Sequence, residues 1–355
     1  MQKFKAFLHH VFIDGLSGMA LGLFATLIVG TILAQLASAI PGAVGAWASA
    51  VAGTAKVLTG AGIGVGVAVK FKSAPLTILS AAACGMVGAY ASKLLAGTLV
   101  SEGAVVLAGP GEPLGAFIAA LVGIEIGTLV AGKTKLDILL IPLVTIISGS
   151  AVGLLVGPPI SGFMTWLGSL INWGAEQQPF LMGIVVSVLM GIFLTLPISS
   201  AAIGILLGLS GIAAGAATAG CCAHMVGFAV MSFRENRWGG LFAQGVGTSM
   251  LQMPNLVRKP LLWIPPVIAS AITGPVSSVL LGMTSNATGS GMGTAGLVGP
   301  IMTFQTMTEA GVPWTIVLLE ILGVYFLAPA AICLAVSEFM RKRGWIQFGD
   351  LKLDA

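Results

Sequence analysis

Long runs of apolar residues, separated by short charged or glycine-rich breaks, recur from one end of the chain to the other. The first run, Leu16–Leu36, has about twenty residues, which is the length that an α-helix needs to cross a bilayer. Charged residues make up 8% of the chain, whereas soluble domains contain about 25%. The mean hydropathy is +1.03. The sequence therefore predicts an all-α protein that crosses a lipid bilayer many times.

The positive charges predict how the chain is oriented in the membrane. They lie largely at the chain ends and in short loops such as Lys70–Lys72, Lys133–Lys135 and Arg341–Arg343. Because positive loops stay in the cytoplasm, we expect both termini there, and Glu176 on the outer side. The pair Arg258–Lys259 fits this orientation only if the segment before it is a re-entrant hairpin. The charges indicate membrane anchoring, with no nucleic-acid partner.

A glycine-rich run, Gly282–Pro300, interrupts the apolar pattern. It contains six glycines, three threonines, two serines and one asparagine, and no charge. Each helical glycine costs about 1 kcal/mol relative to alanine, so a stable helix facing lipid is excluded here. Irregular backbone at membrane depth persists only when it is buried in protein or lines a wet cavity. The run is therefore either a substrate loop of a transporter or an ordinary loop outside the membrane.

The apolar segments number about 10–11, and several are too short for a full span. Short segments in corresponding places favour an inverted repeat of two five-segment halves with short or re-entrant helices. Chance similarity between small-residue segments is the alternative. The expected parts, in order, are a cytoplasmic amphipathic arm (1–14), a first membrane repeat (15–157), a linker (158–179), a second membrane repeat (180–282), a Gly-rich substrate loop (283–312), a last membrane helix (313–340) and a cytoplasmic tail (341–355).

Few residues in the apolar segments could carry chemistry. Glu125 lies inside an apolar segment, where it could serve as a proton or cation site, a hydrogen-bond acceptor for a polyol, or a structural contact. Glu320 offers the same choice, and His224 is either a packed residue or a site residue, whereas His9 and His10 are expected at the interface. No phosphate-cradling motif, nucleophile–base pair or metal-ligand cluster is legible. We therefore expect no catalytic site, no metal and no cofactor on this chain.

Three motifs carry a resemblance to a known family. The run Gly289–Pro300, the helix break Thr195–Gly204 and the loop Arg234–Gly240 are similar to those of the membrane IIC-type proteins of the bacterial phosphotransferase system (PTS). The subgroup that the chain resembles most is the stand-alone IIC type that includes the perfringolysin O regulators. The resemblance spans about residues 10–340. The Gly-Ile-Thr-Glu motif of glucose-type members is not matched, Gly123–Glu125 being a distant echo of it.

The resemblance implies a function and partners. It implies a permease of the bacterial plasma membrane that takes up a sugar or related small polar solute, working with separate IIA and IIB proteins. As the membrane subunit of a phosphoenolpyruvate-dependent phosphotransferase, it would move as an elevator and form a homodimer. Two alternatives remain open: a membrane regulator or sensor that keeps the fold, and a gradient-driven symporter that uses Glu125.

The solute site is predicted near the bilayer midplane. A sugar-like ligand needs several donors and acceptors that are already held in place. Glycines let the backbone approach the ligand closely, and neutral hydroxyls and amides supply the hydrogen bonds. The predicted substrate-binding residues combine such groups from the glycine-rich run with two residues of the apolar segments: Glu125, His224, Thr284, Ser285, Asn286, Thr288 and Thr294.

Overall fold

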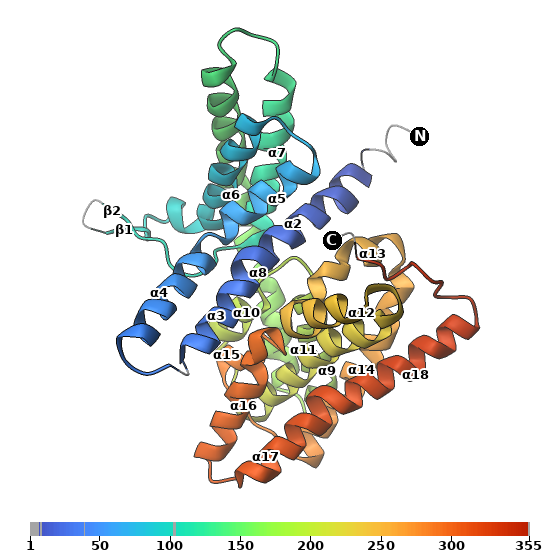
Figure 1. Cartoon of the computed structure of the whole chain (residues 1–355). Coiled ribbons are helices and arrows are strands. Elements are labelled where there is room, and N and C mark those ends of the chain that lie inside the picture. The colour runs from blue at the N-terminus through green and yellow to red at the C-terminus, as the bar shows by residue number, and fades with distance from the viewer. Residues whose placement is uncertain (1–6, 8, 39, 102–103, 354–355) are drawn as a thin grey trace. The chain divides into compact units, whose positions relative to one another are not determined.

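A computed structural model describes residues 7, 9–38, 40–101 and 104–353 of the chain. The chain divides into two compact units, residues 1–163 (unit 1) and 164–354 (unit 2). Both units are built from helices (Figure 1). The division falls inside the long helix α8 (Asp137–Ala175), which contributes its first part to unit 1 and its last part to unit 2.

Seven helices in the described part of the chain are long and apolar enough to cross a bilayer. The bent pair α4 (Gly42–Val57) and α5 (Thr59–Lys70), with an angle of 51° between its members, would bring the number to eight. The predicted all-α, multi-pass membrane protein is therefore confirmed. The seven helices are His10–Ser38, Pro75–Leu95, Pro113–Val130, Asp137–Ala175, Gly211–Met231, Pro260–Leu280 and Trp314–Lys342.

The number is lower than the 10–11 segments expected from the sequence, because several apolar segments fold into short helices. Helix α9 (Pro179–Thr195) has 17 residues and α10 (Ser200–Leu206) has seven. The apolar segment before Arg258 is the end of α12 (Phe233–Phe242), followed by a π-helical and a 3₁₀ turn. The inverted repeat stays a prediction.

Unit 1 begins with one continuous helix and ends in the first part of α8. Its other elements are the bent pair α4 and α5, α6 (Pro75–Leu95), α7 (Pro113–Val130) and a small antiparallel hairpin of β1 (Val100–Ser101) and β2 (Ala104–Val105). Figure 1 shows the hairpin protruding beside the helices of this unit. The continuous first helix comprises a π-helical stretch (His10–Gly15), α2 (Leu16–Leu23), a second π-helical stretch (Phe24–Ile28) and α3 (Val29–Ser38).

Glycines set how closely the helices of unit 1 approach one another. A Cβ added to Gly22 in α2 would lie 2.1 Å from the carbonyl oxygen of Gly62 in α5. On the other side of α5, a Cβ on Gly64 would lie 2.0 Å from the carbonyl oxygen of Ala81 in α6. These distances are far below van der Waals contact, so only glycine permits the observed packing. This is how membrane helices associate when bulky apolar residues give no advantage over lipid.

Unit 2 is organised around α11 (Gly211–Met231), which packs against α9, α14 (Ile264–Pro275) and α18 (Ala328–Lys342). Nearly all of α11 is buried, which its small residues allow. The remaining elements of the unit form its rim and breaks: the π-helical turn Ala243–Gly247, the 3₁₀ turn Ser249–Gln252, α13 (Met253–Arg258), the 3₁₀ turn Pro260–Trp263, the π-helical turn Val276–Leu280, α15 (Ala287–Ser290), the 3₁₀ turn Ala295–Leu297, α16 (Val298–Glu309), α17 (Trp314–Ile321) and the π-helical stretch Leu322–Leu327.

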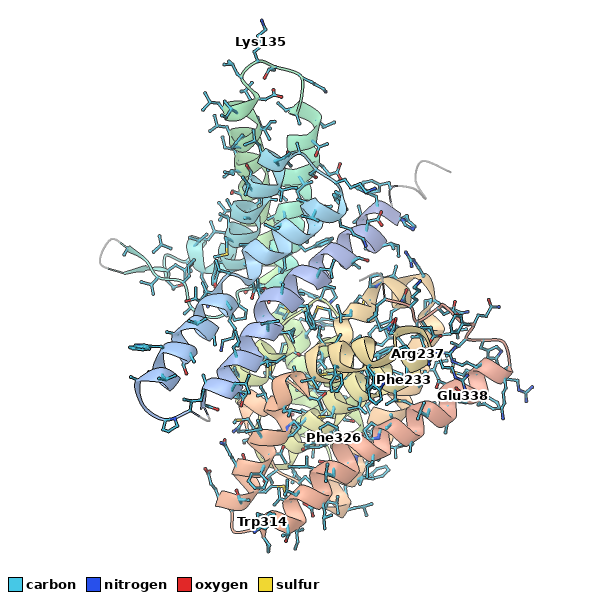
Figure 2. All side chains as sticks on the ribbon, viewed as in Figure 1. Lys135, Phe233, Arg237, Trp314, Phe326 and Glu338 are labelled. Atoms are coloured by element: carbon cyan, nitrogen blue, oxygen red, sulfur yellow. The ribbon has the colours of Figure 1, made fainter. Side chains whose placement is uncertain are left out.

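Helices α17 and α18 form one long helix along unit 2. Figure 2 places Trp314, at its start, at one end of the unit, and Glu338, near its finish, at the other. Arg237 and Phe233 of α12 lie toward the same end as Glu338 (Figure 2). The chain after α18 then folds back as a C-terminal tail, in which Ile346 and Leu351 are 2% and 0% exposed. The expected division into a last membrane helix (313–340) and a cytoplasmic tail (341–355) stays a prediction.

Candidate functional site

His224 is the most deeply buried ionisable side chain that the sequence singled out. It lies on α11 and is 0% exposed. Gly191 of α9 faces it: a Cβ there would lie 2.4 Å from Cδ2 of His224 and 2.8 Å from Nε2. Trp263 and Phe228 flank the ring, with centroids 5.9 Å and 6.2 Å away. The imidazole is therefore held in one place by a glycine on one helix and two aromatic rings.

Two hydroxyls connect His224 to other parts of unit 2. Thr195, at the end of α9, places its Oγ1 3.0 Å from Nδ1 of His224. The same Oγ1 lies 2.8 Å from Oγ of Ser249, on the 3₁₀ turn Ser249–Gln252. All three side chains are 0% exposed. The cluster of Thr195, His224 and Ser249, called the imidazole–hydroxyl cluster below, thus joins three separate segments inside the unit.

One atom of this cluster, Nε2 of His224, has no hydrogen-bond partner among the described residues. Thr195 Oγ1 also lies 3.1 Å from the carbonyl oxygen of Gly191, which can only accept. If Thr195 donates its single proton there, it accepts from Nδ1–H of His224, and Nε2 becomes a bare acceptor. If Thr195 donates to Nδ1 instead, Nε2 carries the proton. In either tautomer, Nε2 is buried and has no hydrogen-bond partner among the described residues.

The glycine-rich run lies against α11 in the interior of unit 2. Ser285 N donates to the carbonyl oxygen of Gly211 at the beginning of α11 (3.2 Å). Farther along, Gly293 lies against Cys221, and Thr294 Oγ1 lies 3.5 Å from Sδ of Met225. The run does not form one continuous helix: the short helix α15 and a 3₁₀ turn form within it, and α16 begins at Val298. Its irregular backbone is buried in protein, as physical chemistry requires.

Two features fix the path of this run. Ser200, at the start of α10, donates from Oγ to the carbonyl oxygen of Gly291 (2.7 Å). At the other end, Gly296 and Leu297 both have a positive φ, 52° and 59°. For Leu297 this left-handed conformation is sterically unfavourable, because the residue has a side chain. A local backbone outlier of this kind is retained when the surroundings enforce it. The run is a defined structure, joined to α10 and α11.

The predicted site residues in the run differ in what they contact. Ser285 is 1% exposed, and its Oγ has no hydrogen-bond partner in the described part of the chain. Asn286 accepts from Gly289 N (3.0 Å) and so caps α15. Thr294 is 0% exposed, Thr284 is partly buried and Thr288 is exposed. The structure therefore places Ser285 and Thr294 along α11, the helix that carries His224.

Glu125 belongs to unit 1 and has a partner there. Its Oε1 lies 2.8 Å from Nε2 of His10, and both side chains are partly exposed, 48% and 38%. His10 also stacks on Phe71, with ring centroids 3.8 Å apart. The first helix, α7 and the turn after α5 therefore meet at this pair. The predicted proximity of Glu125 to the glycine-rich run stays a prediction, since the two belong to different units.

Thr195 and Ser249 were not among the residues predicted for the site. Both carried a signal in the sequence: Thr195 ends an apolar helix just before Pro197, and Ser249 lies in an unusually polar stretch with Gln244, Thr248 and Gln252. All four of those polar side chains are buried. Within the described residues, no three His, Cys, Asp or Glu side chains gather as a metal site. The four cysteines are free and buried.

The arrangement can present hydrogen bonds to a neutral polar solute. Among the described residues it offers two buried polar atoms without a hydrogen-bond partner: an imidazole nitrogen on α11 and, near the start of that helix, a serine hydroxyl of the glycine-rich run. Comparison with known proteins adds one finding: the family model described as "Phosphotransferase system, EIIC" matches residues 13–353. No curated protein matches the chain.

Proposed function

Because the chain belongs to the phosphotransferase system EIIC family, we propose that it carries a sugar or related small polar solute across the bacterial inner membrane. Separate IIA and IIB proteins would phosphorylate the solute as it arrives. Family membership and the apolar helices support the coarse statement, a multi-pass membrane permease of the PTS type. The nature of the solute, the elevator-like movement and the homodimer are parts of the proposal.

The observation that carries the proposal is a pair of unpaired polar atoms in the interior of unit 2. Nε2 of His224 and Oγ of Ser285 are buried without a partner among the described residues. A buried polar group left unsatisfied costs about 1–3 kcal/mol, so such groups in a native protein call for an explanation. Ser285 pairs with Gly211 at the start of α11, and His224 comes 13 residues later, about 20 Å along the helix, so one small solute would not reach both atoms. A polyol offers hydroxyls that both donate and accept, and in this proposal they bond Nε2 of His224.

Access to these atoms requires movement, because both side chains are buried. The segments beside them, the glycine-rich run and the turns at Ala243–Gln252, have short and irregular helical structure. Discontinuous helices form the solute site of many secondary transporters. We therefore propose that these two segments open and close the site. Glu125 would contribute a strong acceptor if the movement brings unit 1 to the solute.

The test begins with purified protein in detergent and a panel of hexoses, pentoses, polyols and amino sugars. Binding of a solute to the folded state raises the melting temperature, so a sugar-like ligand is expected to stabilise the protein in a dose-dependent way. Phosphoenolpyruvate-dependent uptake into vesicles supplied with IIA and IIB proteins would then establish coupling. Stabilisation without phosphoenolpyruvate dependence would point to the symporter that uses Glu125, and absence of both to the regulator.

A matched pair of threonine variants tests the site itself. Thr195→Val removes the hydroxyl that bonds His224 and Ser249, while keeping the size of the side chain. Thr273→Val is the control, because Thr273 is also buried and, among the described residues, its hydroxyl bonds the carbonyl oxygen of Ala269 on its own helix. Thr195→Val should weaken solute binding about tenfold, a factor that corresponds to 1.4 kcal/mol, and Thr273→Val should not. Equal affinities in both variants would remove the imidazole–hydroxyl cluster from the site.

A further inference from the structure

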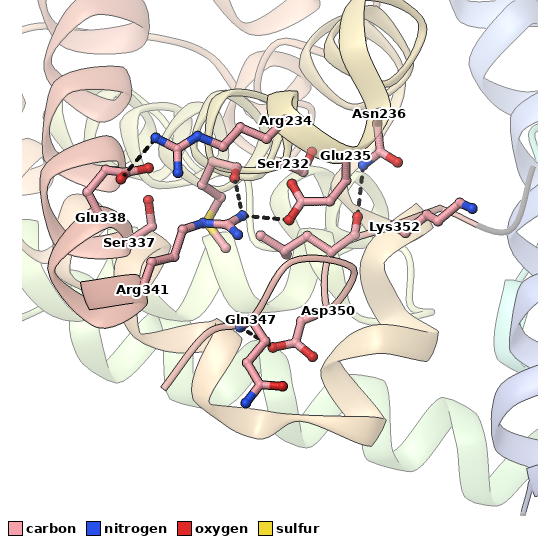
Figure 3. Close-up of polar contacts among 12 residues, drawn as sticks. Ser232, Arg234, Glu235, Asn236, Ser337, Glu338, Arg341, Gln347, Asp350 and Lys352 are labelled. Carbon is pink, nitrogen blue, oxygen red and sulfur yellow. Dashed lines mark hydrogen bonds and ion pairs between the residues drawn. The ribbon is translucent and has the colours of Figure 1, made fainter. Parts of the chain in front are cut away.

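The C-terminal tail, residues 344–353, is docked into unit 2 through its backbone. Asn236 of α12 donates from Nδ2 to the carbonyl oxygen of Leu351 (2.8 Å), and its Oδ1 accepts from Leu353 N (2.9 Å). Figure 3 shows the dashed line that joins Asn236 to the main chain beside Lys352. The side chain of Leu351 is 0% exposed. The tail is therefore held by hydrogen bonds between the Asn236 amide and its main chain and by burial of the Leu351 side chain.

Three buried amides complete the docking. Gln252 donates from Nε2 to the carbonyl oxygen of Leu351 (3.0 Å) and to Oε1 of Gln244 (2.9 Å). Asn255 donates from Nδ2 to the carbonyl oxygen of Lys352 (2.9 Å) and to Oε1 of Gln252 (2.8 Å). Each of these two side chains thus donates one amide proton to the tail and one to the preceding glutamine of the network.

The third amide closes the network on the side away from the tail. Gln244 donates from Nε2 to Oγ of Ser232 (2.8 Å) and to the carbonyl oxygen of Gly240 (3.0 Å). All six amide protons of Gln244, Gln252 and Asn255 are therefore used. Removing the tail would leave two of them without an acceptor in a buried region, which is unfavourable. The segment that carries these amides is polar and short of regular helix, so it depends on such contacts for its conformation.

The same segment supplies Ser249 to the imidazole–hydroxyl cluster. Ser249 lies between Gln244 and Gln252, directly after Thr248, whose backbone is extended (φ −159°, ψ 140°). We propose that the C-terminal tail is a positioning element, which holds residues 243–255 in place and thereby keeps Ser249 against Thr195 and His224. The consequence for solute binding rests on the proposed function, whereas the docking of the tail does not.

Hydrogen exchange followed by mass spectrometry tests the docking in the whole protein in lipid nanodiscs. One variant ends after Arg343. A second, Asn236→Ala, keeps the full chain but loses the two hydrogen bonds between the Asn236 side chain and the tail. In each, the backbone amides of residues 243–255 should exchange about tenfold faster or more, since local opening sets the exchange rate. A synthetic peptide of residues 344–355, added to the truncated protein, should restore protection.

Lys352→Ala is the matched control, because the carbonyl oxygen of Lys352, and not its side chain, accepts the bond from Asn255. Its exchange should equal that of the unmodified protein. Unchanged exchange at 243–255 in both the truncated and the Asn236→Ala proteins would overturn the proposal. So would equal acceleration throughout unit 2 in both, since the tail would then only stabilise the unit as a whole.

Melting temperatures with the sugar panel separate this inference from the proposed function. If the tail variants loosen residues 243–255 and also lose stabilisation by a solute, both stand. If the exchange result holds but no solute stabilises the unmodified protein, the proposed function fails and the positioning role remains. If a solute stabilises the truncated and the complete protein equally, with unchanged exchange, the positioning role fails and the proposed function remains.

Discussion

Arg341 and Glu235 form an ion pair in the interior of unit 2, with Nη2 of Arg341 2.8 Å from Oε1 of Glu235. The two side chains are 10% and 1% exposed, and Figure 3 shows them facing each other between α18 and α12. Arg341 also donates to the carbonyl oxygen of Met231 at the end of α11 (3.1 Å). One guanidinium therefore connects the central helix of the unit with the helix that leads into the tail.

Breaking this pair from one side should be strongly destabilising. Arg341→Met leaves the Glu235 carboxylate buried and unpaired, which costs about 3–5 kcal/mol. The double variant Arg341→Met with Glu235→Leu removes both charges and should recover much of that loss. Thermal unfolding in detergent measures both. A double variant as unstable as the single one would show that the arginine acts through its packing and its bond to Met231, and not through the charge pair.

A second ion pair, between Arg234 and Glu338, serves as the comparison. Its atoms are 3.1 Å apart, but the side chains are 60% and 37% exposed. Exposed pairs contribute about 0–1 kcal/mol, since water solvates both charges when the pair is broken. Arg234→Ala should therefore hardly change the melting temperature.

Glycine packing in unit 1 predicts opposite effects for the same substitution at two positions. Gly64→Ala places a methyl group 2.0 Å from the carbonyl oxygen of Ala81, so α5 and α6 must separate. The loss should be about 1–3 kcal/mol. Gly53 in α4 has open space around the added Cβ, so Gly53→Ala should stabilise by up to about 1 kcal/mol through helix propensity. Melting temperatures that move in the same direction for both variants would contradict this packing.

The sequence predicted the parts of this structure that depend on composition and length. Spans such as α6 and α11 follow from the solvent, because a bilayer demands long apolar helices. The buried, irregular glycine-rich run follows from the poor helix propensity of its residues. The partners of single side chains could not be predicted in this way. Ser249 meets Thr195 only because irregular turns bring together residues 54 positions apart.

Two more contacts show why such partners are hidden in the sequence. His10 pairs with Glu125 across 115 positions, and neither residue has a local pattern that names the other. The docking of the tail depends on side-chain amides that bind main-chain carbonyl oxygens, which every residue possesses. Sequence patterns reveal a polar side chain in an apolar segment. They do not reveal a main-chain carbonyl acceptor, because every residue type has one.

Glu112, directly before α7, predicts a loss of stability as pH rises. Burial raises its pKa to about 7, and a backbone hydrogen bond at Leu114 opposes this shift. Its Oε1 has no partner among the described residues. The folded state thus favours the protonated carboxyl. The contribution of Glu112 to the free energy of unfolding is fully present below the ordinary pKa of 4.5. It is lost as pH rises through about 7, and the loss is at most about 3 kcal/mol.

Melting temperatures between pH 4 and pH 9 measure this dependence. Glu112→Gln keeps the shape of the protonated side chain but cannot ionise, so its profile should be flatter than that of the unmodified protein across neutral pH. Identical slopes in the two proteins would mean that the Glu112 carboxylate finds solvent or a partner when it ionises.

Asp350 in the tail predicts the opposite sign. Burial alone would raise its pKa, but hydrogen bonds from the Lys259 ammonium (2.5 Å) and from Gln347 N, with the nearby positive charges, lower it overall. A lowered pKa contributes stability above the ordinary value of 3.8, which is lost as pH falls through the lower folded value. Acid should therefore loosen the tail first, and Asp350→Asn should loosen it at neutral pH. Hydrogen exchange of residues 346–353 at two pH values tests both statements.

Helix α8 offers a direct test of the predicted orientation, because Lys135 and Glu176 flank its two ends. It has 39 residues, more than the roughly 20 that a membrane span needs. Figure 2 shows Lys135 at the tip of the turn before α8.

In a variant whose four native cysteines are alanine, Lys135→Cys should resist an impermeant maleimide in intact cells, and Glu176→Cys should react. Arg343→Cys should resist it too, since the positive-inside rule assigns Lys135 and Arg343 to the cytoplasm. Labelling of Lys135→Cys from outside, with Glu176→Cys protected, would invert the orientation. Labelling of both would mean that α8 does not cross the membrane.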